Sequence, residues 1–295
     1  MSPRVTVIIP TFNWSSVLPY SIGSVLGQTY TDFELLVIGD GCTDDSQQVV
    51  SCIVDPRLRW INLPENTGHQ TAPNNHGLSQ ARGQIIAYLG HDDLWLPHHL
   101  LLAISAIDAG ADLTYPIVAM IPPNSTHTTF EPCEMEHYEP GLWIPPTGVV
   151  HRKTLSEKVG GWRKFIDVNQ DPESDLWSRM NEANAKFHYI RRLTAVKFPA
   201  IWRKDVYKLK RCHEQAAWFE RIKNEPDFEA NELAKMLIPT FPDKTSLEPF
   251  SHILSEFGDQ IKTRFKRRLR SWGLQKPVDR KRFLGDRRKF KGLDR

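Results

Sequence analysis

Two adjacent carboxylates, Asp92 and Asp93, follow an apolar run that ends at Leu89. Carboxylate oxygens are hard ligands that suit Mg²⁺ or Mn²⁺, and a pair of them can hold a divalent cation while leaving coordination positions for a diphosphate. The cation would neutralise the charge that a diphosphate develops as it leaves. The same residues also suit the start of a helix, where Asp is a favoured cap. The pair by itself leaves both interpretations open.

Acidic residues in two further segments could do chemistry. Asp40 stands between an apolar run and Gly41, where its carboxylate could accept hydrogen bonds from a base or a ribose, or could form an Asx turn. Asp171, Glu173 and Asp175 enter a predicted helix. One of the three could be a general base whose pKa is tuned by burial. They could equally complement the positive end of the helix dipole.

The elements that must position these residues alternate between strand and helix patterns over residues 1–118. This alternation predicts an α/β fold with a mostly parallel sheet flanked by helices. Ligands of such sheets bind beyond the carboxyl ends of the strands, and three polar clusters fall there: Thr11-Phe12-Asn13, Asp40 and His91-Asp92-Asp93. Strands are expected at 5–9, 33–38, 58–62, 85–89 and 113–118, and helices at 15–26, 43–54, 72–82, from Pro97 onward and at 176–187.

Composition and missing motifs exclude several classes of protein. No GxGxxG follows the first predicted strand and no GxxxxGK[ST] occurs, which argues against a glycine-rich dinucleotide site and a P-loop. The four cysteines form no CxxC pair, so neither a zinc knuckle nor a disulfide framework is indicated. Apolar residues make up 40% of the chain, and no apolar run reaches the roughly 18 residues of a membrane span. No signal peptide is expected, and a cytoplasmic protein is predicted.

The C-terminal part differs from the rest in charge. Residues 262–295 carry 15 Lys and Arg against 3 Asp, a net charge of +12, whereas the remainder of the chain has a net charge of −9. A basic tail indicates an anionic partner, either a membrane surface or a nucleic acid. Phe265, Leu269 and Trp272 are interleaved with the charges, as in an interfacial helix. A solvated extension is the alternative.

Six sequence segments match one protein family in their order and spacing. The segments are Val5-Thr6-Val7-Ile8-Ile9-Pro10-Thr11-Phe12-Asn13, Ser24-Val25-Leu26-Gly27-Gln28-Thr29, Phe33-Glu34-Leu35-Leu36-Val37-Ile38-Gly39-Asp40-Gly41-Cys42-Thr43-Asp44-Asp45-Ser46, Asn66-Thr67-Gly68, Asn75-His76-Gly77-Leu78 and residues 89–97. They resemble the family 2 glycosyltransferases, strongly over residues 5–115 and more weakly over 145–215. The resemblance implies a GT-A type, Rossmann-like fold.

The resemblance also implies roles for individual residues. Thr11, Phe12 and Asp40 match positions that bind the nucleoside of a nucleotide-diphosphate sugar. Asn13 and Asn74 are predicted beside them in the same nucleotide-sugar site. The first half of the chain is therefore expected to hold the donor.

The acidic pair matches the DxD-type motif of the family. Asp92 is expected to bind the ribose and the metal–diphosphate, and Asp93 to be the main ligand of the Mn²⁺ or Mg²⁺ ion. His213 resembles a late element that reaches the diphosphate or the metal. The predicted metal ligands are thus Asp93, Asp92 and His213.

Glu173 matches the catalytic base of the family, with Asp171 and Asp175 as alternatives. The base is expected to deprotonate an acceptor hydroxyl on the side away from the leaving diphosphate. The sequence departs from the family pattern at four positions: Gly39 and Gly90 stand where the family often has Asp, Asn74 where it often has Arg, and Glu173 where it usually has Asp.

The predicted function is inverting, metal-dependent sugar transfer from a nucleotide-diphosphate sugar to a saccharide or lipid-linked acceptor, in polysaccharide or glycoconjugate synthesis. Residues 1–118 are expected to bind the donor, 119–238 to bind the acceptor and supply the base, and 239–295 to form a basic helical or disordered appendage. The appendage is expected to contact an anionic membrane at its inner face, and nucleic acid is not expected. Two other classes stay open: a metal-dependent phosphohydrolase built on His91, Asp92 and Asp93, and a non-catalytic module that binds sugar nucleotides or polyanions.

Overall fold

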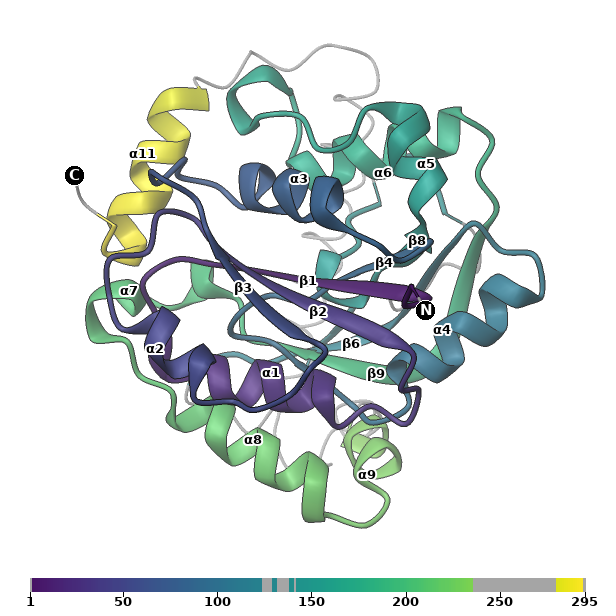
Figure 1. The fold of residues 1–295 in the computed structure, drawn as a ribbon, viewed down its shortest axis with the longest axis horizontal. Helices are drawn as coiled ribbons and strands as arrows, with labels where there is room; N and C mark the ends of the chain where they lie inside the picture. The colour runs from purple at the N-terminus through teal and green to yellow at the C-terminus, as the bar shows by residue number, and fades with distance from the viewer. Residues whose placement is uncertain (1, 124–128, 132–137, 141, 236–279, 294–295) are drawn as a thin grey trace, which may run out of the picture.

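The computed structural model of the chain describes residues 2–123, 129–131, 138–140, 142–235 and 280–293. One curled sheet runs through these residues, with helices on both of its faces (Figure 1). Its strands follow the order β3-β2-β1-β4-β8-β6-β9-β5, and β7 pairs with β6. The strands are β1 (Val5–Thr11), β2 (Phe33–Gly39), β3 (Leu58–Asn62), β4 (Ile85–Tyr88), β5 (Leu94–Trp95), β6 (Leu113–Met120), β7 (Thr129–Glu131), β8 (Val150–Arg152) and β9 (Phe187–Lys197).

The long strand pairs are parallel. β1 pairs in parallel with β2 and β4, β2 with β3, and β6 with β9. The antiparallel pairs of β5, β7 and β8 span only two or three residues each. The prediction of an α/β fold with a mostly parallel sheet is therefore confirmed. Because β1, β2, β4, β6 and β9 run in one direction, their carboxyl ends meet at one edge of the sheet.

The helices divide the core into two layers. Val7 and Ile9 of β1 pack toward α1 and α4, while Ile8 packs on the other face, toward α3 and α6. Residues on both faces of β1 are buried, and only Pro10 is partly exposed, which is why the sequence is nearly continuously apolar rather than alternating. The helices are α1 (Leu18–Leu26), α2 (Ser46–Ser51), α3 (Thr71–Gln80), α4 (His99–Asp108), α5 (Lys153–Val159), α6 (Pro172–Glu182), α7 (Val206–Leu209), α8 (His213–Asn224), α9 (Phe228–Lys235) and α11 (Arg280–Lys291).

The strand β9 is absent from the sequence prediction, which continued a helix to residue 187. Helix α6 ends at Glu182, and Asn184 then adopts a positive φ of 63° that turns the chain into β9. The pairing of β9 with β6 skips Arg191 and Arg192, so a bulge interrupts the two-residue alternation that would have indicated a strand. This strand delivers Lys197 to the carboxyl edge of the sheet.

The basic C-terminal segment lies only partly within the described residues. Residues 239–279 of the predicted appendage fall outside them, and α11 is the described part. The helix packs beside α7, where the Asp205 backbone N–H donates to the Phe290 carbonyl at 2.8 Å. In Figure 1 it lies, in yellow, next to the loops that follow the parallel strands. Among the described helices, none combines the length and apolar character that a membrane span requires.

Candidate functional site

A pocket of about 720 Å³ lies at the carboxyl edge of the sheet. Its walls come from the ends of β1, β2, β4 and β9, from the start of α6, and from α11. A concave site that gathers polar groups from distant segments is the usual place for a small-molecule ligand. Six residues predicted from the sequence line this pocket: Thr11, Phe12, Asp40, Asp92, Asp171 and Glu173.

Asp92 and Asp93 are adjacent but have different surroundings. The Asp93 carboxylate is fully buried and accepts hydrogen bonds from Thr147 Oγ1, Lys197 Nζ at 2.8 Å and the Phe198 backbone N–H at 3.0 Å. Asp92 lines the pocket instead, and burial together with Asp93 raises its pKa to about 7. The carboxylate of Asp93, predicted as the main metal ligand, is thus hydrogen-bonded to protein groups, and Asp92 is the member of the pair that lines the pocket.

Asp92 fits the divalent cation that the family resemblance implies. The described residues hold no cluster of three or more His, Cys, Asp or Glu side chains suited to a metal ion. Mg²⁺ at nucleotide sites is nevertheless often held by one or two carboxylates together with the substrate phosphates. A buried carboxylate with a raised pKa gains most from a nearby cation, so Asp92 is the residue that would hold it.

Lys197 is a site residue that the sequence prediction missed. Lys197 is the last residue of β9 and lines the pocket. Its Nζ atom lies 2.8 Å from Oδ2 of Asp93. Burial alone would lower the pKa of Lys197, but Asp93, Asp92 and Glu173 together outweigh burial and raise it. The lysine therefore stays charged at the centre of the acidic cluster. The only sign of this residue in the sequence is a Lys at the end of an apolar run. No local pattern connects that Lys with Asp93, which stands 104 positions earlier.

Glu173 stands on the first turn of α6 and faces the pocket. Its Oε1 atom accepts a hydrogen bond from the Trp143 indole N–H at 3.1 Å. Burial and the nearby Asp171 raise the pKa of Glu173, which favours proton uptake. Asp175 points elsewhere and pairs with Arg179 at 2.8 Å. Of the three acidic residues here, Asp171 and Glu173 line the pocket and Asp175 does not.

Asp40 organises a loop at the edge of the pocket. Its carboxylate accepts hydrogen bonds from the Thr67 hydroxyl at 2.7 Å, the Thr67 N–H at 3.1 Å, the Gly68 N–H at 3.2 Å and Asn66 Nδ2 at 2.9 Å. Burial raises the pKa of Asp40 even though these hydrogen bonds oppose the change. Most of the hydrogen-bond acceptor positions of the Asp40 carboxylate are therefore used to hold residues 66–68 in place.

His91 is held by hydrogen bonds within the pocket wall. Its Nδ1 atom lies 2.8 Å from Thr11 Oγ1, and its Nε2 atom lies 3.3 Å from the Tyr207 hydroxyl. Trp14 packs edge-on against the imidazole, with ring centroids 5.5 Å apart. Burial lowers the pKa of His91 to about 4, so the ring is neutral near pH 7. Both ring nitrogens are engaged, which disfavours His91 as the metal ligand of a phosphohydrolase.

The remaining predicted residues differ in their relation to the pocket. Asn13 accepts a hydrogen bond from the Thr43 N–H at 2.7 Å and so ties together two loops rather than lining the pocket. Asn74 is fully buried, and neither side-chain polar atom has a hydrogen-bond partner among the described residues. It lines a small cavity of about 70 Å³ beside Glu173. His213 is exposed at the start of α8 and is not among the residues that line the pocket.

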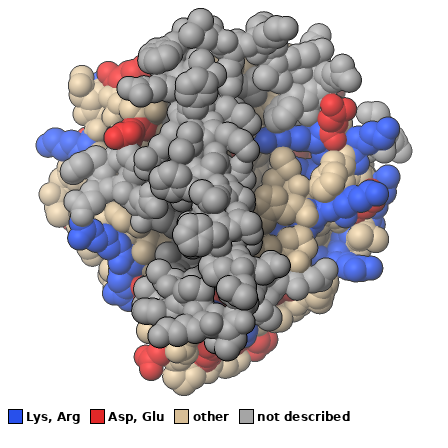
Figure 2. Space-filling model, turned by 180° about the vertical axis from the view of Figure 1, so that it is seen from behind, with Lys and Arg blue, Asp and Glu red and all other residues tan. Residues whose placement is uncertain are grey.

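Three cations of α11 line the same pocket: Arg287, Arg288 and Lys291. The described part of α11 carries seven Lys or Arg residues and one Asp. Figure 2, seen from behind, shows Lys and Arg side chains gathered at the right edge of the molecule, the side on which α11 lies. The basic segment predicted as an appendage thus contributes part of the pocket.

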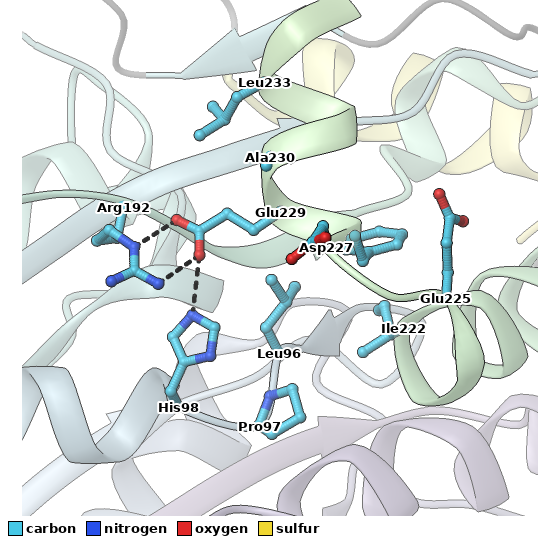
Figure 3. A pocket seen from close by; sticks show the side chains of 11 residues that line it. Leu96, Pro97, His98, Arg192, Ile222, Glu225, Asp227, Glu229, Ala230 and Leu233 are labelled. Carbon is cyan, nitrogen blue, oxygen red and sulfur yellow. Dashed lines mark hydrogen bonds and ion pairs between the residues drawn. The ribbon is translucent and has the colours of Figure 1, made fainter.

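A second pocket of about 560 Å³ lies between β9, α8 and α9 (Figure 3). At its wall, Glu229 accepts two hydrogen bonds from Arg192, both at 2.6 Å, and pairs with His98 at 3.3 Å. Burial would raise the pKa of Glu229, but the hydrogen bonds from His98 and Arg192 outweigh it and lower the pKa to about 2. The carboxylate of Glu229 is therefore committed to Arg192 and His98.

Comparison with known proteins places the chain among sugar-transferring relatives. Over 101 residues it is 36% identical to an Escherichia coli protein named UDP-Glc:alpha-D-GlcNAc-diphosphoundecaprenol beta-1,3-glucosyltransferase WfgD, a match that covers 34% of the chain and 40% of that protein. Over 96 residues it is 34% identical to a Campylobacter jejuni protein named GalNAc(5)-diNAcBac-PP-undecaprenol beta-1,3-glucosyltransferase. This match covers 31% of the chain and 30% of that protein. The chain therefore spans well under half the length of these relatives.

Solved structures share the fold. S. aureus TarS 1–349 in complex with UDP-GlcNAc superposes with a TM-score of 0.58 at 18% identity, over 83% of the chain and 77% of that structure. The mannosyltransferase PcManGT from Pyrobaculum calidifontis, in complex with GDP-Man and Mn²⁺, superposes with a TM-score of 0.52 at 15% identity. This superposition covers 99% of the chain and 86% of that structure. These likenesses confirm the predicted GT-A type fold. The model of the family described as Glycosyl transferase family 2 matches residues 6–154, about half of the sequence, and the chain belongs to this family.

Proposed function

We propose that the chain transfers a sugar from a nucleotide-diphosphate sugar to an acceptor hydroxyl, with inversion at the anomeric carbon. One observation carries this proposal: Glu173, a carboxylate whose pKa burial raises, lines the same pocket as Asp92 although the two belong to separate segments. A base and an acidic ligand from different elements can act on opposite ends of one reaction centre. Family membership and the names of the relatives support the same reaction.

The proposed reaction is a single displacement. The acceptor oxygen forms a bond to the anomeric carbon while the bond from that carbon to the diphosphate oxygen breaks, and the electron pair of the broken bond leaves with the nucleoside diphosphate. Glu173 takes the proton of the acceptor hydroxyl, and its raised pKa makes it a stronger base than an ordinary carboxylate. The Trp143 indole N–H donates to Glu173 Oε1 and orients it. Attack from the side opposite the leaving group inverts the configuration.

The leaving diphosphate needs positive charge. Lys197 supplies one fixed cation beside Asp92 and Asp93. A Mn²⁺ or Mg²⁺ ion held by Asp92 would add Lewis-acid stabilisation of the developing diphosphate charge. Among the two adjacent carboxylates, we assign this ligand role to Asp92, because the oxygens of Asp93 already accept hydrogen bonds from protein groups.

The nucleoside is proposed to lie between Phe12 and the loop of residues 66–68. Asp40 holds that loop through four hydrogen bonds, which supports a role in shaping the nucleoside site. The unpartnered amide of Asn74, which lines the small cavity next to Glu173, is proposed to take up a polar group of the donor. Each of these groups lies at the carboxyl edge of the sheet, where such folds bind nucleotides.

The acceptor is proposed to be a lipid-linked saccharide, since two relatives carry names that include a diphosphoundecaprenol or PP-undecaprenol acceptor. Contact of the segment 262–295 with an anionic membrane surface remains a prediction. It is tested by sedimentation of the full chain with anionic and neutral liposomes at low salt. Equal sedimentation with both kinds of liposome would contradict it.

The reaction is tested by two measurements on the full chain. Thermal unfolding with a panel of UDP, GDP and dTDP sugars, with and without Mn²⁺, should give an increase in Tm for the donor that binds. The matching nucleoside diphosphate should then be released faster when saccharide acceptors are added. A chain that binds donors but never releases nucleotide would instead be a binding module. Release of inorganic phosphate from phosphate esters would indicate a phosphohydrolase.

A further inference from the structure

Helix α11 forms one wall of the pocket, although it lies far outside the residues that the family model matches. Lys291 follows Arg287 by four positions and Arg288 by three, which are the spacings that place side chains on the same side of a helix, and all three line the pocket. The helix is seated closely against α7: a side chain at Gly292, which has a φ of +82°, would lie 2.7 Å from Lys208 Cγ. This fit holds the three cations at the mouth of the pocket.

The neighbours of these cations compensate their charge incompletely. Arg287 pairs with Asp171 at 3.4 Å, whereas Arg288 donates to the neutral amide oxygen of Asn66 at 3.5 Å. Lys291 has no hydrogen-bond or ion-pair partner among the described residues, and burial lowers its pKa, with Asp92 only partly opposing the change. Burying an ammonium group without a partner is costly. The arrangement therefore favours binding of an anion between α11 and the strand ends.

The position of Arg288 indicates which part of a ligand this anion would be. The guanidinium approaches the loop that Asp40 holds, and a Cβ at Gly68 would lie 2.7 Å from Arg288 Nη1. The Arg288 guanidinium thus packs directly against the backbone of Gly68, in the loop proposed to contact the nucleoside. Lys291 lines the same pocket, close enough to Asp92 for the two charges to interact. Both cations therefore lie on the wall of the pocket that also holds the 66–68 loop and Asp92.

We propose that Arg288 and Lys291 bind the diphosphate of the donor, so that α11 completes the nucleotide-sugar site of this chain. The inference rests on the proposed function, because it assigns the anion to a nucleoside diphosphate. Guanidinium groups bind phosphate oxygens through paired, charge-assisted hydrogen bonds, and an ammonium group adds a compact point charge. In the opposite arrangement α11 would block the pocket until it is displaced, and removing its cations would then strengthen diphosphate binding rather than weaken it.

The test measures binding of UDP, GDP and dTDP, and of the matching nucleosides, to the full chain by titration calorimetry at low salt. For the nucleoside diphosphate that the unsubstituted chain binds, the double variant Arg288→Gln/Lys291→Gln should bind at least ~10-fold more weakly, the scale for losing charge-assisted hydrogen bonds. Binding of the nucleoside should be unchanged. Lys289→Gln is the matched control, since Lys289 is exposed on the same helix and does not line the pocket.

The outcomes are distinguishable. Equal diphosphate binding by the double variant and the unsubstituted chain overturns the role of α11, and tighter binding by the double variant shows a blocking helix, which also overturns it. If the unsubstituted chain binds none of the three diphosphates, the proposed function itself fails. Lys291→Arg keeps the charge and should retain diphosphate binding, which separates loss of a contact from loss of the fold. A uniform loss of nucleoside and diphosphate binding in the double variant would contradict the assignment to the diphosphate.

Discussion

The Nζ atom of Lys197 lies 2.8 Å from Oδ2 of Asp93, and this pair joins the end of β9 to the loop after β4 across 104 residues of sequence. Asp93 is fully buried, and the side chain of Lys197 is only 19% exposed. The carboxylate accepts two further hydrogen bonds, from Thr147 and from the Phe198 backbone. The pair thus anchors the floor of the pocket, while the neighbouring Asp92 lines the pocket itself.

Substitution of Asp93 by Ala should destabilise the protein. The change leaves the Lys197 ammonium buried without its partner, and removing one member of a buried ion pair costs roughly 3–5 kcal/mol. Thermal unfolding of the ligand-free protein should show a clearly lower Tm. Asp45→Ala serves as the control because Asp45 is exposed, and it should change stability by no more than about 0.5 kcal/mol. A wild-type Tm for Asp93→Ala would contradict the anchoring role.

Substitution of Asp92 by Asn should instead weaken the binding of Mn²⁺ in the presence of nucleotide. Asn has the same shape but lacks the charge that would hold Mn²⁺, so Mn²⁺ affinity in the presence of nucleotide should fall at least ~10-fold. The measurement is a calorimetric titration of Mn²⁺ into protein saturated with the nucleotide that binds. Asp45→Asn should leave the titration unchanged. Equal Mn²⁺ affinity in Asp92→Asn and wild type would move the ligand role to another group.

The pH dependence of stability should also depend on Asp92. Its pKa is about 7 in the folded protein and 3.8 ordinarily, so the folded state binds more protons between these values and loses stability as pH rises through about 7. Asp92→Asn stays neutral and should therefore be more stable than wild type at pH 8 without metal. This gain should shrink as the pH is lowered to 5. The check is a pair of urea unfolding series, and a pH-independent difference between the two proteins would refute the raised pKa.

Substitution of Glu173 by Gln should separate binding from turnover. Donor and metal binding should persist, while kcat should fall by at least ~100-fold, a typical scale for losing a general base. In wild type, the acidic limb of the kcat/KM profile should lie above the ordinary Glu value of 4.5, because burial and Asp171 raise the pKa of Glu173. The variant should lack this limb.

The alternative bases provide the comparison for Glu173. Asp175→Asn breaks the ion pair with Arg179 and should lower Tm more than it lowers kcat. Asp171→Asn removes the partner of Arg287 at the rim and should mainly change KM. A selective loss of kcat in either of these variants, with normal turnover by Glu173→Gln, would move the base to that residue.

The sequence by itself determined the parallel half of the sheet and the edge where the site lies. Short, continuous runs rich in β-branched residues, such as those of β1 and β2, are typical of strands buried on both faces, and a helix between two such strands indicates a parallel crossover. Parallel strands end at the same edge, so Thr11, Asp40 and Asp92 had to lie near one another whatever the details of packing. Local pattern and strand direction suffice for this much.

Only the tertiary structure decided what each group at that edge does. Asp92 and Asp93 are neighbours in sequence, and the docking of β9 determines that Asp93 is the one sealed by Lys197 and Phe198. The bulge in β9 interrupts the two-residue alternation that would have indicated a strand, so the position of Lys197 could not be predicted. The same holds for α11, whose basic composition is equally compatible with a solvated tail, and whose packing beside α7 brings Lys291 to the pocket. These placements depend on contacts between segments far apart in the chain, which no local sequence pattern encodes.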